Sequence, residues 1–184
     1  MITKMELATI LKENGFEDEM INRILNKKIK VLLERGKADE IQKIFQVLKE
    51  NEIKKETIEN CLLVLAKGKA DEMQKIFQVV KENGIGKETI ENCLTVLARG
   101  KADEIRKILQ VLKENEIGKE TMENCLYVLA TGKADEIRKI LQVLKENEIG
   151  KETMENCLYV LATGKADEIR KILQVLKENE IGKE

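Results

Sequence analysis

The feature that most constrains this chain is an internal repeat. Residues 151–182 copy residues 119–150 letter for letter, and residues 87–118 differ from that copy at three positions. A looser copy occupies residues 55–86. A fixed period of 32 residues is typical of a helical solenoid, in which each repeat buries its apolar face only against its neighbours. We therefore expect an all-α fold, an α-solenoid of tandem 32-residue repeats.

The repeat pattern assigns residues 1–184 to a single α-solenoid. Residues 1–36 form a divergent N-terminal end, and residues 37–54 supply one long helix and its linker before the four copies. Residues 183–184 begin a further copy. The last copy keeps the interior apolar pattern, so we expect an uncapped C-terminal end. Three explanations stay open: an array cut from a longer one, a designed array, and an end that associates with a second copy of the chain.

Each copy contains two amphipathic segments. In the copy at 119–150, apolar residues recur at helical spacing over residues 119–131 and again over residues 134–147. The connection between the segments is too short to do anything but reverse the chain direction. The pattern therefore predicts an antiparallel αα-hairpin of two helices in each copy.

The N-terminal residues predict a capped first helix. The sequence TKME at Thr3–Glu6 is a capping box, with Ile2 and Leu7 placed as a hydrophobic staple. Residues 14–15, Asn-Gly, end this helix. A longer or kinked helix is expected over residues 18–35, because its apolar positions keep helical spacing.

The linkers between copies differ at one position. Gly84 follows an asparagine there and is a standard helix stop. In the other copies that position is a glutamate: Glu52, Glu116, Glu148 and Glu180. Those copies should either tolerate slight strain or use the preceding asparagine as the left-handed residue.

The composition argues against an electrostatic attraction to nucleic acid or to a membrane surface. The chain has 33 basic and 34 acidic residues and a net charge of −1. It contains no apolar run long enough to span a bilayer and no signal-peptide pattern at the N-terminus. The four cysteines recur once per copy and not in pairs, so disulfides are not expected. We expect a cytoplasmic protein in a reducing compartment, with no membrane partner.

Chemistry for catalysis is missing from the sequence. There is no histidine and no serine, which excludes the usual catalytic triads and histidine metal sites. The cysteines are flanked by asparagine and leucine, and we expect them to be packed as small apolar residues. One cysteine per copy does not assemble a tetrahedral zinc site. We therefore expect no enzyme activity, no metal and no cofactor.

The Gly-Lys pair before the second helix of each copy is the one motif with a ligand-binding mechanism. A glycine and a lysine at a helix N-terminus can hold a phosphate through free backbone N–H groups and the positive end of the helix dipole. Aspartate and glutamate follow in every copy and oppose an anion there. The alternative is a tight turn with a solvated lysine. The lysines predicted to contact phosphate are Lys69, Lys101, Lys133 and Lys165.

Differences between the copies gather on one face of the first helix. One variable position reads Leu63, Thr95, Tyr127 and Tyr159, and the position four residues later reads Lys67, Arg99, Thr131 and Thr163. Residues four apart are neighbours on a helix, so these positions share a face. We predict a partner-binding surface there, with the two tyrosines as anchors. Neutral drift at positions without a role explains the variation equally well.

Two resemblances follow from these segments. LKENGFEDEMINRIL at residues 11–25 and VVKENGIGKETIENCL at residues 79–94 resemble the helical repeats of mitochondrial transcription termination factors. That family binds nucleic acid, although this chain lacks the proline that those repeats place after the helix. The Gly-Lys turns also resemble the turn of TAL-effector-like repeats, in which glycine and lysine contact DNA phosphates. Both resemblances imply an α-solenoid that binds nucleic acid.

The sequence as a whole favours a non-enzymatic scaffold that binds a protein or peptide or drives assembly. Nucleic-acid binding along the row of Gly-Lys turns is the alternative. A designed repeat protein with no natural ligand is the third hypothesis.

Overall fold

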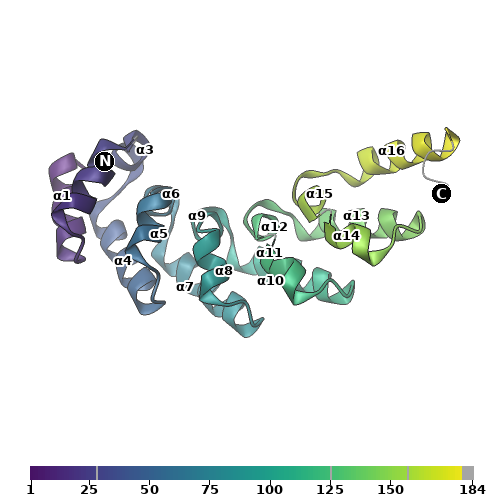
Figure 1. Cartoon of the computed structure of the whole chain (residues 1–184), viewed down its shortest axis with the longest axis horizontal. Helices are drawn as coiled ribbons and strands as arrows, with labels where there is room; N and C mark the ends of the chain where they lie inside the picture. The colour runs from purple at the N-terminus through teal and green to yellow at the C-terminus, as the bar shows by residue number, and fades with distance from the viewer. Residues whose placement is uncertain (28, 125, 157, 180–184) are drawn as a thin grey trace. The chain divides into compact units, whose positions relative to one another are not determined.

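The fold is built from α-helices. The computed structural model describes the chain except for residues 28, 125, 157 and 180–184. Within the described residues every regular element is a helix, α1 to α16 (Figure 1), which confirms the predicted all-α class. The chain divides into two compact units, residues 1–102 and residues 103–184.

The helices of the first unit have these bounds: α1 (Lys4–Glu13), α2 (Asp18–Asn26), α3 (Lys30–Arg35), α4 (Ala38–Glu50), α5 (Lys55–Asn60), α6 (Leu63–Lys67), α7 (Ala70–Glu82), α8 (Lys87–Asn92) and α9 (Thr95–Arg99). Helix α10 (Ala102–Glu114) begins at the last residue of this unit. The second unit continues with α11 (Lys119–Asn124), α12 (Tyr127–Thr131), α13 (Ala134–Glu146), α14 (Lys151–Asn156), α15 (Leu158–Thr163) and α16 (Ala166–Glu178).

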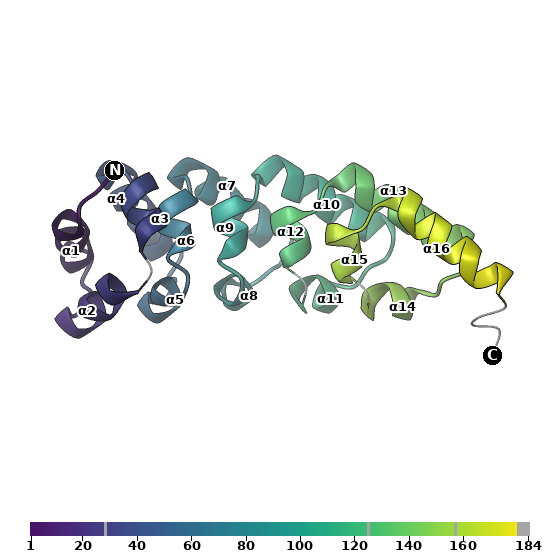
Figure 2. The same cartoon turned by 90° about the horizontal axis from the view of Figure 1, so that it is seen from above.

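Equivalent helices of successive copies pack against each other within each unit. In the first unit α6 lies between α3 and α9, and α4 lies between α1 and α7 (Figure 2). In the second unit α12 packs against α15, and α13 packs against α16. The neighbouring helices therefore form a regular, repeat-like pattern that is compatible with a solenoid.

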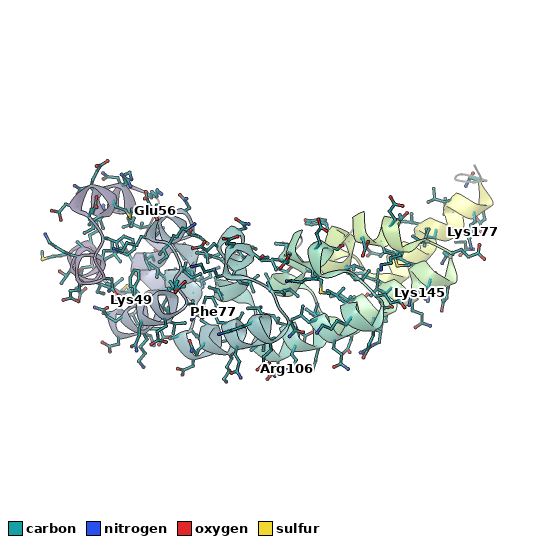
Figure 3. All side chains as sticks on the ribbon, turned by 60° about the horizontal axis from the view of Figure 1, so that its bottom comes forward. Lys49, Glu56, Phe77, Arg106, Lys145 and Lys177 are labelled. Carbon is teal, nitrogen blue, oxygen red and sulfur yellow. The ribbon has the colours of Figure 1, made fainter. Side chains whose placement is uncertain are left out.

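The long helices follow the predicted amphipathic pattern. Each of α4, α7, α10, α13 and α16 has 13 residues. In α13 the apolar residues at helical spacing are Ile137, Ile140 and Leu141, which are fully buried, and Leu144, which is half-buried. The opposite face is charged, and Figure 3 shows Lys145 on α13 and Lys177 on α16 at the surface. The spacing of apolar residues was sufficient to predict these elements.

The prediction of one continuous first helix in each copy is wrong. Residues 119–131 form two short helices, α11 and α12, and the copies at 55–86 and 87–118 show the same division. In the copy at 151–182 the corresponding position, Cys157, lies outside the described residues. The break in the first copy lies at Cys61, whose φ of −130° and ψ of 65° leave the helical region. In the copies at 55–86, 87–118 and 119–150 the described residues therefore form three helices instead of the predicted two-helix hairpin.

Burial gives the physical reason for this break. A continuous amphipathic helix buries one stripe, which here would contain Met122, Leu126 and Leu129. Val128 would lie about a third of a turn away from that stripe. In the structure Val128, Leu129 and the adjacent Ala130 are all buried. The break changes the direction of the helix axis, and three consecutive apolar side chains of α12 are buried as a result.

The N-terminal helix forms as predicted. The Glu6 backbone N–H donates to Thr3 Oγ1 at 3.1 Å, and the Thr3 backbone N–H donates to Glu6 Oε2 at 2.8 Å. These hydrogen bonds from Thr3 lower the pKa of Glu6 below its ordinary value. Ile2 and Leu7 are buried, as the hydrophobic staple requires. Helix α1 ends before Gly15, whose φ of 77° is left-handed.

The longer or kinked helix expected over residues 18–35 is divided into two helices in the structure. Helices α2 and α3 replace it, and Lys27 at the end of α2 has an extended backbone with ψ of 170°. Lys27 then reaches Glu59 in the next copy, with Nζ 3.0 Å from Glu59 Oε1. The interruption therefore places a cation of this divergent end against α5.

The linkers resolve the two alternatives left open for their glutamates. Glu52, Glu116 and Glu148 themselves adopt the left-handed conformation, with φ between 55° and 59°. The preceding Asn51 has a φ of −96°, so asparagine is not the left-handed residue there. These glutamates accept a modest conformational cost that Gly84, with φ of 73°, avoids. Glu180 lies outside the described residues.

The described helices were also compared with the requirements for a membrane span. Among the described residues, no helix combines the length and the apolar character needed to cross a membrane.

Candidate functional site

The Gly-Lys turns place their lysines at the surface. Lys69, Lys133 and Lys165 are the N-cap residues of α7, α13 and α16, and their side chains do not cap these helices. Lys101 stands directly before α10. All four side chains are exposed, and Lys165 Nζ lies 3.5 Å from Glu168. Their role as phosphate contacts stays a prediction.

The backbone N–H group of the residue that follows each of these lysines already donates to a carboxylate. The first residue of α7, of α10, of α13 and of α16 donates its N–H to a glutamate of the preceding copy. We call these four contacts the carboxylate caps; they are 2.6 to 2.7 Å long and join Ala70 to Glu40, Ala102 to Glu72, Ala134 to Glu104, and Ala166 to Glu136. A charged acceptor at a helix N-terminus satisfies both the N–H and the helix dipole. A phosphate that bound there through the backbone would have to displace a carboxylate.

In the first unit a groove of about 400 Å³ lies between two successive Gly-Lys turns. Four basic side chains line it: Arg35, Lys37, Lys67 and Lys69. Three acidic side chains, including Glu40 of a carboxylate cap, line it as well. The small excess of positive charge makes weak anion binding feasible, but the acidic residues oppose it.

The predicted tyrosine anchors come together in the second unit. Tyr127 and Tyr159 stack with ring centroids 5.7 Å apart and an interplanar angle of 18°. Tyr127 is 37% exposed and Tyr159 is 64% exposed. They stand at the N-terminal ends of the neighbouring helices α12 and α15. The structure thus assembles an exposed aromatic pair from two residues that are 32 positions apart.

The threonines one turn later do not compete for a partner. Thr131 Oγ1 donates to the Tyr127 carbonyl oxygen at 2.9 Å, and Thr163 Oγ1 donates to the Tyr159 carbonyl oxygen at 3.0 Å. Both hydroxyl protons are therefore used inside the helices. The tyrosine rings and hydroxyls remain as the groups that this face offers.

The equivalent face of the first unit has a different chemistry. Leu63 on α6 and Thr95 on α9 are half-buried, and α6 and α9 are neighbours. Lys67 and Arg99, at the ends of these helices, are exposed. The first unit therefore presents a leucine, a threonine and two cationic side chains where the second unit presents stacked rings.

A second set of glutamates connects the copies in the opposite direction. Glu91 Oε1 accepts the Lys54 backbone N–H at 2.7 Å, and Glu155 Oε1 accepts the Gly118 backbone N–H at 3.0 Å. Each of these glutamates reaches back to the start of the first helix in the preceding copy. The carboxylate caps reach forward, so the two sets together hold adjacent copies in register.

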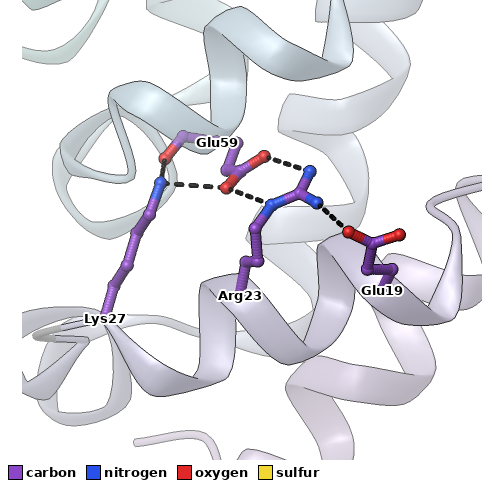
Figure 4. Close-up of polar contacts among 4 residues, drawn as sticks. All are labelled: Glu19, Arg23, Lys27 and Glu59. Atoms are coloured by element: carbon purple, nitrogen blue, oxygen red, sulfur yellow. Dashed lines mark hydrogen bonds and ion pairs between the residues drawn. The ribbon is translucent and has the colours of Figure 1, made fainter.

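Glu59 is the counterpart of these glutamates in the first copy and has cations as partners (Figure 4). Its two carboxylate oxygens accept hydrogen bonds from Arg23 Nε and Nη2, both at 3.1 Å. Lys27 Nζ lies 3.0 Å from Glu59 Oε1, and Glu19 pairs with Arg23 at 2.9 Å. The hydrogen bonds from Arg23 and then Lys27 lower the pKa of Glu59 to about 2. This cluster anchors the divergent end to the first full copy.

The thiol of Cys61 is a poor nucleophile at neutral pH. Cys61 and Cys93 are free and half-buried. Burial raises the pKa of the Cys61 thiol, although the backbone N–H groups of Val64 and Leu63 act in the opposite direction. A raised pKa reduces the thiolate population at neutral pH. Cys125 and Cys157 lie outside the described residues.

Metal binding has no candidate in the part of the chain that the structure describes, because no three His, Cys, Asp or Glu side chains gather there as ligands.

Comparisons with protein-family models, with curated proteins and with solved structures find no match to this chain. The resemblances to mitochondrial transcription termination factors and to TAL-effector-like repeats are therefore not confirmed by a family.

The sequence analysis missed both sets of glutamates that join the copies. Their signal was present, since a glutamate recurs at the same two positions of each full copy. The sequence alone indicates only that the aspartate and glutamate after each Gly-Lys turn oppose an anion there. In the structure the glutamate of this pair accepts a backbone N–H at the start of the long helix in the next copy. Such a contact can be predicted only when the distance between copies is known.

Proposed function

We propose that this chain is an α-solenoid of 32-residue repeats that serves as a non-enzymatic scaffold for a protein or peptide partner. The stacked pair Tyr127 and Tyr159 carries this proposal, because both rings are exposed on the neighbouring helices α12 and α15. Tyrosine supplies a large contact area and a hydrogen-bonding hydroxyl, and it is enriched among residues that dominate binding energy. The partner expected here is a peptide segment that packs an apolar side chain on the rings.

The test is a peptide selection followed by substitution. Peptides that bind the full chain would be selected from a displayed random library, and their affinity would be measured by fluorescence anisotropy. We expect Tyr127→Ala with Tyr159→Ala to weaken binding about tenfold or more, since loss of one binding anchor costs that much. Both side chains are exposed, so the helical circular dichroism should stay unchanged.

The matched control is Leu63→Ala with Thr95→Ala, at the equivalent positions of the first unit. This variant should bind the selected peptides as the unmodified chain does. Equal losses in the two double variants, or no loss in either, would contradict the assignment of the tyrosine face.

Nucleic-acid binding is the second candidate, favoured by the exposed lysines of the Gly-Lys turns and by the groove between two of these turns. Binding of an oligonucleotide pool should then weaken steeply with salt, because counterions are released. Charge reversal at Lys69, Lys101, Lys133 and Lys165 should abolish it. If neither peptides nor oligonucleotides bind, the array without a natural ligand becomes the favoured hypothesis.

A further inference from the structure

One edge of the first unit carries a row of exposed cations. Helices α3, α6 and α9 are neighbours, and each ends in a basic residue that is followed, two positions later, by the lysine of a Gly-Lys turn (Figure 2). These exposed side chains, which we call the cation row, are Arg35, Lys37, Lys67, Lys69, Arg99 and Lys101. None of them forms a salt bridge with another described residue.

The fold does not require cations at these helix ends. In the second unit the equivalent residues are Thr131 and Thr163, so α12 and α15 end without a basic side chain in the last turn. The hydroxyls of both threonines bond within their own helices. The cations of the first unit therefore remain available to a partner.

A groove gives part of the cation row a concave shape. It is the groove of about 400 Å³ between two successive Gly-Lys turns, and four members of the row line it. Two of the acidic side chains in its lining, Glu40 and Glu72, already accept the backbone N–H groups of Ala70 and Ala102. An anionic occupant would therefore contact the cationic side chains and not the N–H groups at a helix start.

We infer that the cation row binds an acidic peptide in a polyproline II conformation, with an acidic residue at every third position. Packed helices lie about 8–10 Å apart, and the cation pairs at their ends follow that spacing. A polyproline II helix has three residues per turn and rises about 3.1 Å per residue, so every third side chain lies on the same side, about 9 Å further along. Charge repulsion within an acidic segment favours extended conformations. Three successive acidic residues of the peptide then meet the cation pairs of α3, α6 and α9.

Nucleic acid fits the cation row less well. Double-stranded DNA carries about one charge per 1.7 Å, which is much denser than one pair of cations per helix spacing. Proteins that bind single strands stack the bases on aromatic side chains. The aromatic residues of the first unit are Phe16, Phe45 and Phe77, and all three are buried. The exposed Asp39 and Asp71 in the same turns also oppose a dense polyanion more strongly than a peptide with few charges.

The experiment measures the binding of two labelled peptides of equal composition to the full chain by fluorescence anisotropy. The spaced probe is Glu-Pro-Pro repeated four times, and the clustered probe joins its four glutamates in one block before the prolines. We expect the spaced probe to bind about threefold or more tightly, because only its carboxylates have the spacing of the cation row. Its binding should weaken as salt is raised.

Charge reversal at two helix ends tests the cation row itself. Lys67→Glu with Arg99→Glu should weaken binding of the spaced probe about tenfold, since two weak attractions become repulsions. The matched control is Lys49→Glu with Lys81→Glu, which changes the net charge equally and also lies in the last turn of two helices. These exposed lysines stand at the far ends of α4 and α7, about 16 Å along the axis from the helix starts beside the row, so the affinity should change by about twofold at most.

A neutral variant covers the case in which the reversed chain does not fold. Lys67→Thr with Arg99→Thr copies the residue found at these positions in the second unit, and it should weaken the spaced probe about threefold.

Three results would overturn the inference. They are no binding of the spaced probe at low salt, equal binding of the two probes, and equal losses in the row variant and the matched control. An oligonucleotide that binds more tightly than the spaced probe and loses its binding in the row variant would also overturn it, because the row would then be a nucleic-acid site. The outcome is independent of the test of the tyrosine face, because none of these substitutions touches Tyr127 or Tyr159.

Discussion

Helices α13 and α16 have identical sequences and different surroundings. In α13 the side chains of Ile140 and Val143 are fully buried, because α15 and α16 pack against the helix. In α16 the equivalent Ile172 and Val175 are more than half exposed. The comparison shows that the amphipathic pattern determines which face is apolar, whereas the neighbouring copy determines whether that face is buried.

The acidic residues of the same two helices repeat this lesson. Glu136 of α13 forms a carboxylate cap with the Ala166 backbone N–H at 2.7 Å. Glu168, its equivalent in α16, lies 3.5 Å from Lys165 within its own helix start. The same glutamate position therefore joins two copies in α13, whereas in α16 it forms only a surface ion pair.

The largest expected effect separates the two isoleucines. Ile140→Ala should lower the free energy of unfolding by about 2–5 kcal/mol, because it removes a fully buried side chain and leaves a cavity. Ile172→Ala should change it by no more than about 0.5 kcal/mol, since the side chain is mostly hydrated. Urea unfolding followed by circular dichroism, at a protein concentration where the chain is monomeric, measures both. Similar losses in the two variants would show that α16 is buried in the monomer.

A smaller difference is expected between the two glutamates. Glu136→Ala should cost about 1 kcal/mol, because the Ala166 N–H loses its charged acceptor. Glu168→Ala should fall within about 0.5 kcal/mol of the unmodified chain, as is usual for an exposed ion pair. The same urea unfolding experiment gives both values. Glu136→Gln keeps an acceptor oxygen and serves as the control; a full loss in that variant would argue against the cap.

The smallest expected effect concerns the other end of the chain, where Glu59 has the cationic partners Arg23 and Lys27 and its counterpart Glu155 accepts the Gly118 backbone N–H. The pKa of Glu59 in the folded chain is about 2, below its ordinary value of 4.5. A lowered folded pKa stabilises the fold above pH 4.5, and this stabilisation is lost as the pH falls toward 2. Arg23 and Lys27 are 48% and 41% exposed, so solvent screens the interaction.

Urea midpoints of the unmodified chain and of Glu59→Gln, measured from pH 7 down to pH 2.5, test this linkage. The two midpoints should differ at pH 7 and converge as the pH falls. The exposed Glu56, one turn earlier on α5, supplies the control variant Glu56→Gln, which should follow the unmodified chain throughout. A gap between Glu59→Gln and the unmodified chain that stays constant with pH would rule out the assigned pKa.

Local patterns in the sequence predicted several elements correctly. The capping box at Thr3 and Glu6 and the long helix α13 depend on residues within one or two turns of each other. The two tyrosines were predicted to belong to one face, and their stacking follows from the regular neighbourhood of α12 and α15. The break at Cys61 could not be predicted in this way, because the apolar spacing on both sides of it continues as if the helix were intact.

The sequence by itself determined the helical class, the period of the repeat and the face of each long helix that is apolar. These properties arise from side chains a few positions apart, and the chain carries that information locally. Only the tertiary structure decided which apolar faces are covered, which glutamates cap a neighbouring helix and where the first segment of each copy breaks. Each of these outcomes depends on atoms about 30 or more positions away in the chain, whose distance is fixed when the copies pack.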